Sequence, residues 1–83
     1  SEPAIEVTSK EKKRLSYMEQ KEWETIEDDI AALEEETAVL TEAMNGQGSD
    51  FTKLQELQKR LAETELHLEE KMARWEYLSE FID

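Results

Sequence analysis

The chain has 83 residues, of which 22 are Asp or Glu and 10 are Lys or Arg, so its net charge is −12 at pH 7. This length allows one small domain at most, and the lack of a long apolar run within it excludes a membrane-spanning helix. The chain has no cysteine, which excludes disulfides and thiolate zinc sites and fits a reducing compartment, so we expect a cytoplasmic location.

Residues 1–15 are predicted to form a linker. They show no helical period, and Pro3 disfavours a helical conformation of the residue before it. The linker ends in a run of positive charge, namely Lys10, Lys12, Lys13 and Arg14. We therefore expect a flexible, basic N-terminal arm.

A helix is predicted over residues 16–44. Ser16 is followed three positions later by Glu19, the spacing of a capping box, in which each side chain accepts from the backbone N–H of the other residue. Apolar residues and one threonine then recur at alternating steps of three and four, which is typical of a coiled-coil face: Trp23, Ile26, Ile30, Leu33, Thr37, Leu40 and Met44.

A turn at residues 45–50 and a second helix over 51–82 follow. The turn contains Gly46 and Gly48, which end helices well, and Ser49 or Asp50 can cap the next helix. The second helix carries a heptad seam formed by Leu54, Leu57, Leu61, Thr64, Leu68, Met72, Trp75, Leu78 and Ile82. Lys71 occupies one inward position, and Met72 is expected to cover it.

The short connector predicts that the two helices are antiparallel neighbours. The fold class is therefore all-α, an antiparallel two-helix coiled-coil hairpin. Pairing residues at equal distances from the middle of the connector places Trp23 beside Trp75 at the open end, here called the base, and the connector is the tip. Lys59 and Arg60 fall opposite the acidic run 34–36 and are expected to be neutralised there, while Lys71 and Arg74 fall near the base.

The positive residues that gather at the base are the candidate binding residues. Lysine and arginine bind phosphates without reading bases, and an exposed tyrosine can stack on an unpaired base. The predicted nucleic-acid-binding set is Lys10, Lys12, Lys13, Arg14, Tyr17, Lys21, Lys71 and Arg74. Tyr77 lies near enough to stack as well. The alternative is a solvated basic linker whose charges pair with neighbouring glutamates.

Neither a metal site nor a catalytic site is predicted. His67 has Glu63 and Glu70 on its helix, but the Glu-x-x-His spacing of bundle metal sites is missing because position 64 is Thr. No pair of carboxylates has an apolar pocket that would raise a pKa for acid–base work. We therefore expect no metal, no cofactor in this chain and no enzyme activity of its own.

Residues 12–24 resemble a known family. Their pattern, Leu-Ser-Tyr-x-Glu-Gln-x-Glu-Trp-Glu behind a basic run, is similar to the opening of the C-terminal domain of bacterial ABC-F ATPases, most closely the Uup-like subgroup. Residues 48–51 and 74–78 resemble the start and end of the second helix of that domain, so the resemblance covers about residues 10–80.

The resemblance implies a parent protein with two ATP-binding cassettes that acts on ribosomes or nucleic acid. This chain has no GxxxxGK[ST] loop and no ABC signature, so ATP and Mg²⁺ are expected in the parent and not here. Carried over by position, the matching basic residues are Lys12, Lys13, Arg14 and Lys21. The implied partner is DNA, ribosomal RNA or tRNA, bound by a monomeric hairpin that does not bind membranes.

The alternative function is a protein-interaction or dimerisation coiled coil with no nucleic-acid role. Its binding surface would use Val39, Leu66 and Phe81, which the predicted hairpin leaves exposed. Against self-association, the first helix carries much like charge on its faces.

Overall fold

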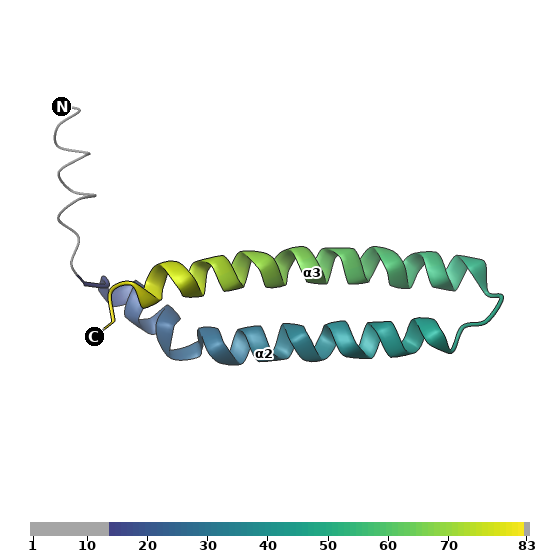
Figure 1. Ribbon diagram of the computed structural model, residues 1–83, viewed down its shortest axis with the longest axis horizontal. Helices are drawn as coiled ribbons and strands as arrows, with labels where there is room; N and C mark the ends of the chain where they lie inside the picture. The colour runs from purple at the N-terminus through teal and green to yellow at the C-terminus, as the bar shows by residue number, and fades with distance from the viewer. Residues whose placement is uncertain (1–13, 83) are drawn as a thin grey trace, which may run out of the picture.

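The computed structural model describes residues 14–82, and nearly all of them lie in two helices, α2 (Tyr17–Asn45) and α3 (Phe51–Ser79). The helices run side by side in opposite directions and are joined by a short connector at one end (Figure 1). The predicted all-α antiparallel hairpin is therefore confirmed, and residues 14–82 contain no strand. The arm predicted at residues 1–15 lies outside the described residues except for Arg14 and Leu15.

Helix α2 begins at the capping box that the sequence predicts. The Glu19 N–H donates to Ser16 Oγ at 3.2 Å, and the Ser16 N–H donates to Glu19 Oε1 at 2.9 Å. Ser16 is therefore the N-cap and Tyr17 the first helical residue. These two bonds satisfy amide groups that have no partner within the helix.

The connector is built from residues with turn chemistry. The Gly46 N–H donates to the Ala43 carbonyl at 3.2 Å, and Gly48 has φ +60°, a conformation that glycine adopts without a steric cost. Asp50 caps α3, since its Oδ1 accepts from the Lys53 N–H at 3.1 Å. Helix α3 ends at Ser79 instead of the predicted residue 82, because the last amides bond to carbonyls three positions back and form a turn.

The core lies at the base of the hairpin. Leu15, Ile26 and Leu78 are buried there, the last two completely. Several partly buried side chains pack against them, namely Trp23, Ile30, Trp75 and Phe81. Two expectations are wrong here: Leu15 belongs to the core and not to the arm, and Phe81 is half-buried because the turn after α3 folds it onto this core.

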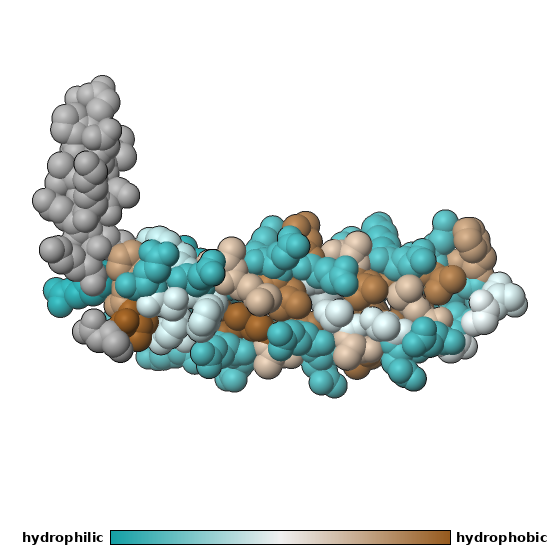
Figure 2. Space-filling model, in the orientation of Figure 1, coloured by the Kyte–Doolittle hydropathy of each residue, from teal (hydrophilic) through white to brown (hydrophobic). Residues whose placement is uncertain are grey.

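Towards the tip the core is thinner. Leu40 and Leu57 are buried, but Phe51, the first residue of α3, is 68% exposed. Apolar side chains gather along the seam between the helices, and hydrophilic ones cover its edges (Figure 2). Val39 and Leu66 are exposed, as predicted.

Two further seam predictions on α3 are wrong. Ile82 is exposed, because the helix ends before it. Met72 does not cover the Lys71 position, since Met72 is 49% exposed and the Lys71 side chain is 29% exposed. Lys71 fills this half-buried position itself, which a long apolar stem with a charged end allows.

The predicted register holds at the contacts of Arg60 and Arg74 and is displaced by about one helical turn at some other contacts. Equal distance from the connector places Lys71 level with Glu24, whereas its partner is Asp29, and Thr64 contacts Glu36. Side chains in a helix lean towards its own N-terminus, which lies at the base for α2 and at the tip for α3. The displaced contacts therefore join an α2 residue nearer the tip with an α3 residue nearer the base.

Candidate nucleic-acid interface

The two tryptophans pack against each other between the helices at the base. The rings of Trp23 and Trp75 are stacked, with centroids 6.1 Å apart and planes 19° apart, as the predicted hairpin requires. The Trp75 indole N–H also donates to Glu27 Oε2 at 3.3 Å. Because both rings pack against the core, they are structural and do not form a stacking platform for bases.

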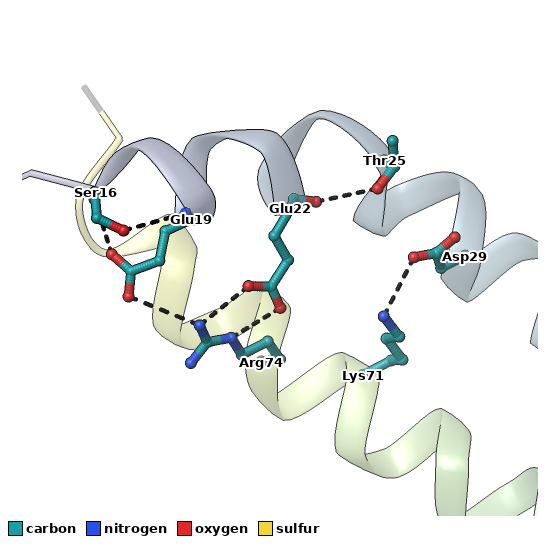
Figure 3. A network of polar contacts seen from close by, with 7 residues as sticks. All are labelled: Ser16, Glu19, Glu22, Thr25, Asp29, Lys71 and Arg74. Atoms are coloured by element: carbon teal, nitrogen blue, oxygen red, sulfur yellow. Dashed lines mark hydrogen bonds and ion pairs between the residues drawn. The ribbon is translucent and has the colours of Figure 1, made fainter.

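Arg74 is held by two carboxylates of α2 (Figure 3). Its Nε and Nη2 donate to the two oxygens of Glu22 at 2.9 and 3.0 Å, and Nη2 lies 3.7 Å from Glu19 Oε2. The guanidinium also lies over the Tyr77 ring, 5.2 Å from its centroid. A fork-to-fork pair of this kind fixes geometry as well as charge, so Glu19 links the helix cap to the second helix.

This pair shifts both titrating groups. The hydrogen bond from Arg74 lowers the pKa of Glu22, against a smaller opposing effect of burial, and the positive charges of Arg74 and Lys71 lower it further. The same hydrogen bond raises the pKa of Arg74. Both shifts favour the charged forms, so the ion pair persists at neutral pH.

Lys71 is paired in the same way. Its Nζ lies 3.2 Å from Asp29 Oδ2; the Lys71 side chain is partly buried, and the Asp29 side chain is about half exposed. The expectation that the base collects unpaired positive charge is therefore wrong for Lys71 and Arg74. Glu22 and Asp29 lie two turns apart on the same side of α2, and this spacing is a sequence signal that points to the two pairs once the register is known. Nearer the tip, Arg60 meets Glu36 at 3.5 Å, as predicted. The same prediction is wrong for Lys59, because no ion pair within residues 14–82 involves it.

Three candidate residues remain exposed near the start of α2: Arg14, Tyr17 and Lys21. Tyr17 is 71% exposed, and Lys21 Nζ lies 5.8 Å from the centroid of its ring. Lys21 is also 4.0 Å from Glu24, at the outer limit of an ion pair. We call these three residues the outer basic surface. Lys10, Lys12 and Lys13 lie outside the described residues.

The part of the chain that the structure describes offers neither a metal site nor a membrane span. No group of three His, Asp or Glu side chains in residues 14–82 could hold an ion, and His67 is exposed. Neither α2 nor α3 is apolar enough to cross a bilayer.

Comparisons with known proteins agree with this architecture. The chain matches the family described as "ABC transporter C-terminal domain" over residues 14–80. It is 47% identical over 74 residues to the "Uncharacterized ABC transporter ATP-binding protein YfmR" of Bacillus subtilis (strain 168). That alignment covers 89% of this chain and 12% of the relative, and no solved structure matches. The match over both helices shows that the chain belongs to the family of ABC transporter C-terminal domains.

Proposed function

We propose that this accessory C-terminal domain contacts nucleic acid through the outer basic surface and the preceding basic run, with DNA, ribosomal RNA or tRNA as the partner. The supporting observation is that Arg14, Tyr17 and Lys21 are all exposed near the start of α2, where the only ion pair of Lys21 within residues 14–82 is the 4.0 Å contact with Glu24. Lys71 and Arg74, in contrast, are held by carboxylates of the other helix at 3.2 and 2.9 Å. Exposed cations release counterions from phosphates, and a neighbouring tyrosine can stack on an unpaired base.

Lys71 and Arg74 have a different role in this proposal. A phosphate could reach Arg74 only by displacing Glu22 and Glu19, which already bind its guanidinium. The two residues instead hold α3 against the first turns of α2 (Figure 3), and so keep the outer basic surface in place.

The acidity of the chain restricts this contact to a local surface. Charges on exposed groups are screened over about 10 Å at 0.1 M ionic strength, and much of the acidic excess lies on residues further along the hairpin. At the base, Arg74 offsets one of the two negative charges of Glu19 and Glu22. The proposed contact therefore depends on the exposed Arg14 and Lys21 and on the basic run that precedes them, and not on the net charge of the hairpin.

We infer that ATP and Mg²⁺ bind elsewhere in the parent, because the relative is named an ATP-binding protein and this chain corresponds to 12% of it. We also infer a monomeric, cytoplasmic domain. Dimerisation through Val39, Leu66 and Phe81 has less support, since Phe81 packs on the core and the other two lie on different helices.

The test is salt-dependent binding of the 83-residue chain to labelled duplex DNA, single-stranded DNA and tRNA, followed by fluorescence anisotropy. Lys13→Glu with Arg14→Glu should lower the slope of log K against log salt by about 2, about one unit for each lost phosphate contact. Lys53→Glu with Lys59→Glu makes the same change in charge nearer the tip and should leave the slope unchanged. Equal binding by both double variants would contradict the proposal.

A further inference from the structure

A groove runs between the helices along one edge of the seam, in the half of the hairpin nearer the base. Its volume is about 500 Å³. Its floor is apolar and is formed by Ile30, Ala31, Met72, Ala73 and Trp75. Its rim consists of three carboxylates, Glu27 and Glu34 from α2 and Glu76 from α3.

Two alanines account for the hollow. Ala31 and Ala73 lie on facing edges of the two helices, where longer side chains would fill the space between them. The α2 residues that line the groove follow the spacing i, i+3, i+4, i+7, so they form one stripe along the helix. Met72, Trp75 and Glu76 repeat the first part of this spacing on α3, and the groove therefore follows the helix axes.

The two edges of the seam differ in their charges. On the opposite edge, Glu22 and Asp29 are bound to Arg74 and Lys71 across the helices. On the groove edge, no ion pair within residues 14–82 involves Glu34 or Glu76, and the hydrogen bond that Glu27 accepts comes from the neutral Trp75 indole. The groove thus combines an apolar floor with a negative rim whose charge is not neutralised within the described hairpin.

We propose that this groove binds a basic amphipathic helix of a partner protein. Apolar side chains of the partner would cover Met72 and the alanines, while flanking lysines or arginines would meet the carboxylates of the rim. A third helix suits a groove between two helices, because it completes a bundle. The stripe from Glu27 to Glu34 is about 10 Å long at 1.5 Å per residue, which matches two turns of a partner helix.

Charge argues against the other occupants. The negative rim repels the phosphates of nucleic acid, and a second copy of this chain would bring another net charge of −12 to the same surface. The inference therefore goes beyond the proposed function: the outer basic surface binds a polyanion, and the groove binds a cationic helix.

The probe is a labelled synthetic peptide of about three helical turns, with leucines at i, i+3, i+4 and i+7 and with lysines and arginines on its flanks. The matched control peptide has the same leucines and has glutamates in place of the basic residues. We expect anisotropy titration of the 83-residue chain to show saturable binding of the basic peptide and none of the acidic one. Equal binding of the two peptides would overturn the proposal.

Variants locate the binding. Ala31→Arg with Ala73→Arg fills the groove with repelling charge and should weaken the basic peptide about tenfold or more. Ala38→Arg with Ala62→Arg changes one exposed alanine on each helix outside the groove, so composition, charge and helix propensity are matched. Circular dichroism verifies that both variants fold. Equal affinity of the two variants for the peptide would contradict the assignment.

Substitutions that change the structure less test the same groove in case the Ala→Arg variant does not fold. Glu34→Gln with Glu76→Gln keeps the shape of side chains that have no ion-pair partner within residues 14–82, and should weaken binding about threefold to tenfold. Glu42→Gln with Glu56→Gln removes two exposed carboxylates outside the groove and should have a smaller effect. No difference between these two pairs would overturn the role of the rim.

Two further measurements separate this inference from the proposed function and from dimerisation. The Lys13→Glu, Arg14→Glu variant should bind nucleic acid more weakly and bind the peptide normally. The groove variant, Ala31→Arg with Ala73→Arg, should bind the peptide more weakly and still bind nucleic acid. Loss of both ligands in the folded groove variant would contradict a separate site. Sedimentation equilibrium should show a monomer, and a dimer that Ala31→Arg with Ala73→Arg dissociates would assign the groove to a second copy.

Discussion

Different interactions hold the two helices together at the base and at the tip of the hairpin. The tip has a covalent connector, and the buried side chains nearest to it are Leu40 and Leu57. The base is the open end, where nothing covalent joins the helices, yet the fully buried Ile26 and Leu78 lie there. Among residues 14–82, the hydrogen bonds and ion pairs between helices run from Glu36 towards the base, and none lies nearer the tip.

In this hairpin the core lies at the end where no covalent link joins the helices. The ends of a helix pair fray unless packing holds them. Here the tryptophan stack, the Arg74 fork and the turn that folds Phe81 back all act at the end without a covalent link. The open end is therefore the ordered platform from which the outer basic surface is presented.

We expect the largest loss of unfolding free energy when a buried leucine of α3 is truncated, and the loss should differ between the two ends of the helix. Leu78→Ala at the base empties a fully buried site and should cost about 3–5 kcal/mol, while Leu57→Ala towards the tip should cost about 2–3 kcal/mol, because its surroundings can collapse more easily. Urea unfolding followed by circular dichroism measures both. A larger loss for Leu57→Ala would reverse the proposed difference between the two ends.

Removal of the Arg74 fork should have a smaller effect. Arg74→Met leaves Glu22 and Glu19 without their cation and should cost about 1 kcal/mol, a modest value because the side chain is partly exposed. Arg74→Lys keeps the charge but cannot bind both oxygens of Glu22, so it should restore only part of the loss. Full recovery with lysine would show that charge alone, and not the fork geometry, holds the base.

Variants of the two N-cap residues test whether the caps at the base and at the tip contribute differently to stability. Ser16→Ala removes the capping box at the base and should cost about 1 kcal/mol. Asp50→Ala removes the single cap bond at the tip and should cost slightly less. Thermal unfolding of the two variants gives the comparison. Equal losses would mean that the difference between base and tip lies in packing and ion pairs alone.

The contribution of the Glu22 ion pair to stability should depend on pH, and we expect this effect to be the smallest of those considered. Because the pKa of Glu22 is lowered by folding, its ion pair stabilises the hairpin above the usual glutamate pKa of about 4.3 and loses that effect as pH falls through the lowered value. The difference in unfolding free energy between the native chain and Glu22→Gln should therefore shrink on acidification. Glu42→Gln, on the tip half of α2, controls for the removal of one negative charge.

Much of the fold could be predicted from sequence because its signals are local. The heptad seams, the capping box and the short connector fix two antiparallel helices and bring Trp23 to Trp75. The partner of Lys71 could not be predicted so directly, because the lean of side chains along each helix displaces this contact by about one turn from the level that equal spacing predicts.

The candidate site was predicted only in part for the same reason. Spacing identifies positive residues at the base, but only coordinates separate the exposed Lys21 from the paired Arg74. Leu15 and Phe81 were missed as core residues because they lie outside the helices, where no periodicity marks them. The groove depends on Ala31 and Ala73, whose small size becomes informative once the register is known.

Native-state hydrogen exchange, read residue by residue by NMR, tests most directly whether the open end is the more stable one. Amides around Ile26 and Trp75 should exchange more slowly than those around Leu40 and Leu54, since opening the base requires the loss of the core and of the Arg74 and Lys71 ion pairs. Slower exchange near the connector, or fast exchange throughout the base, would contradict it.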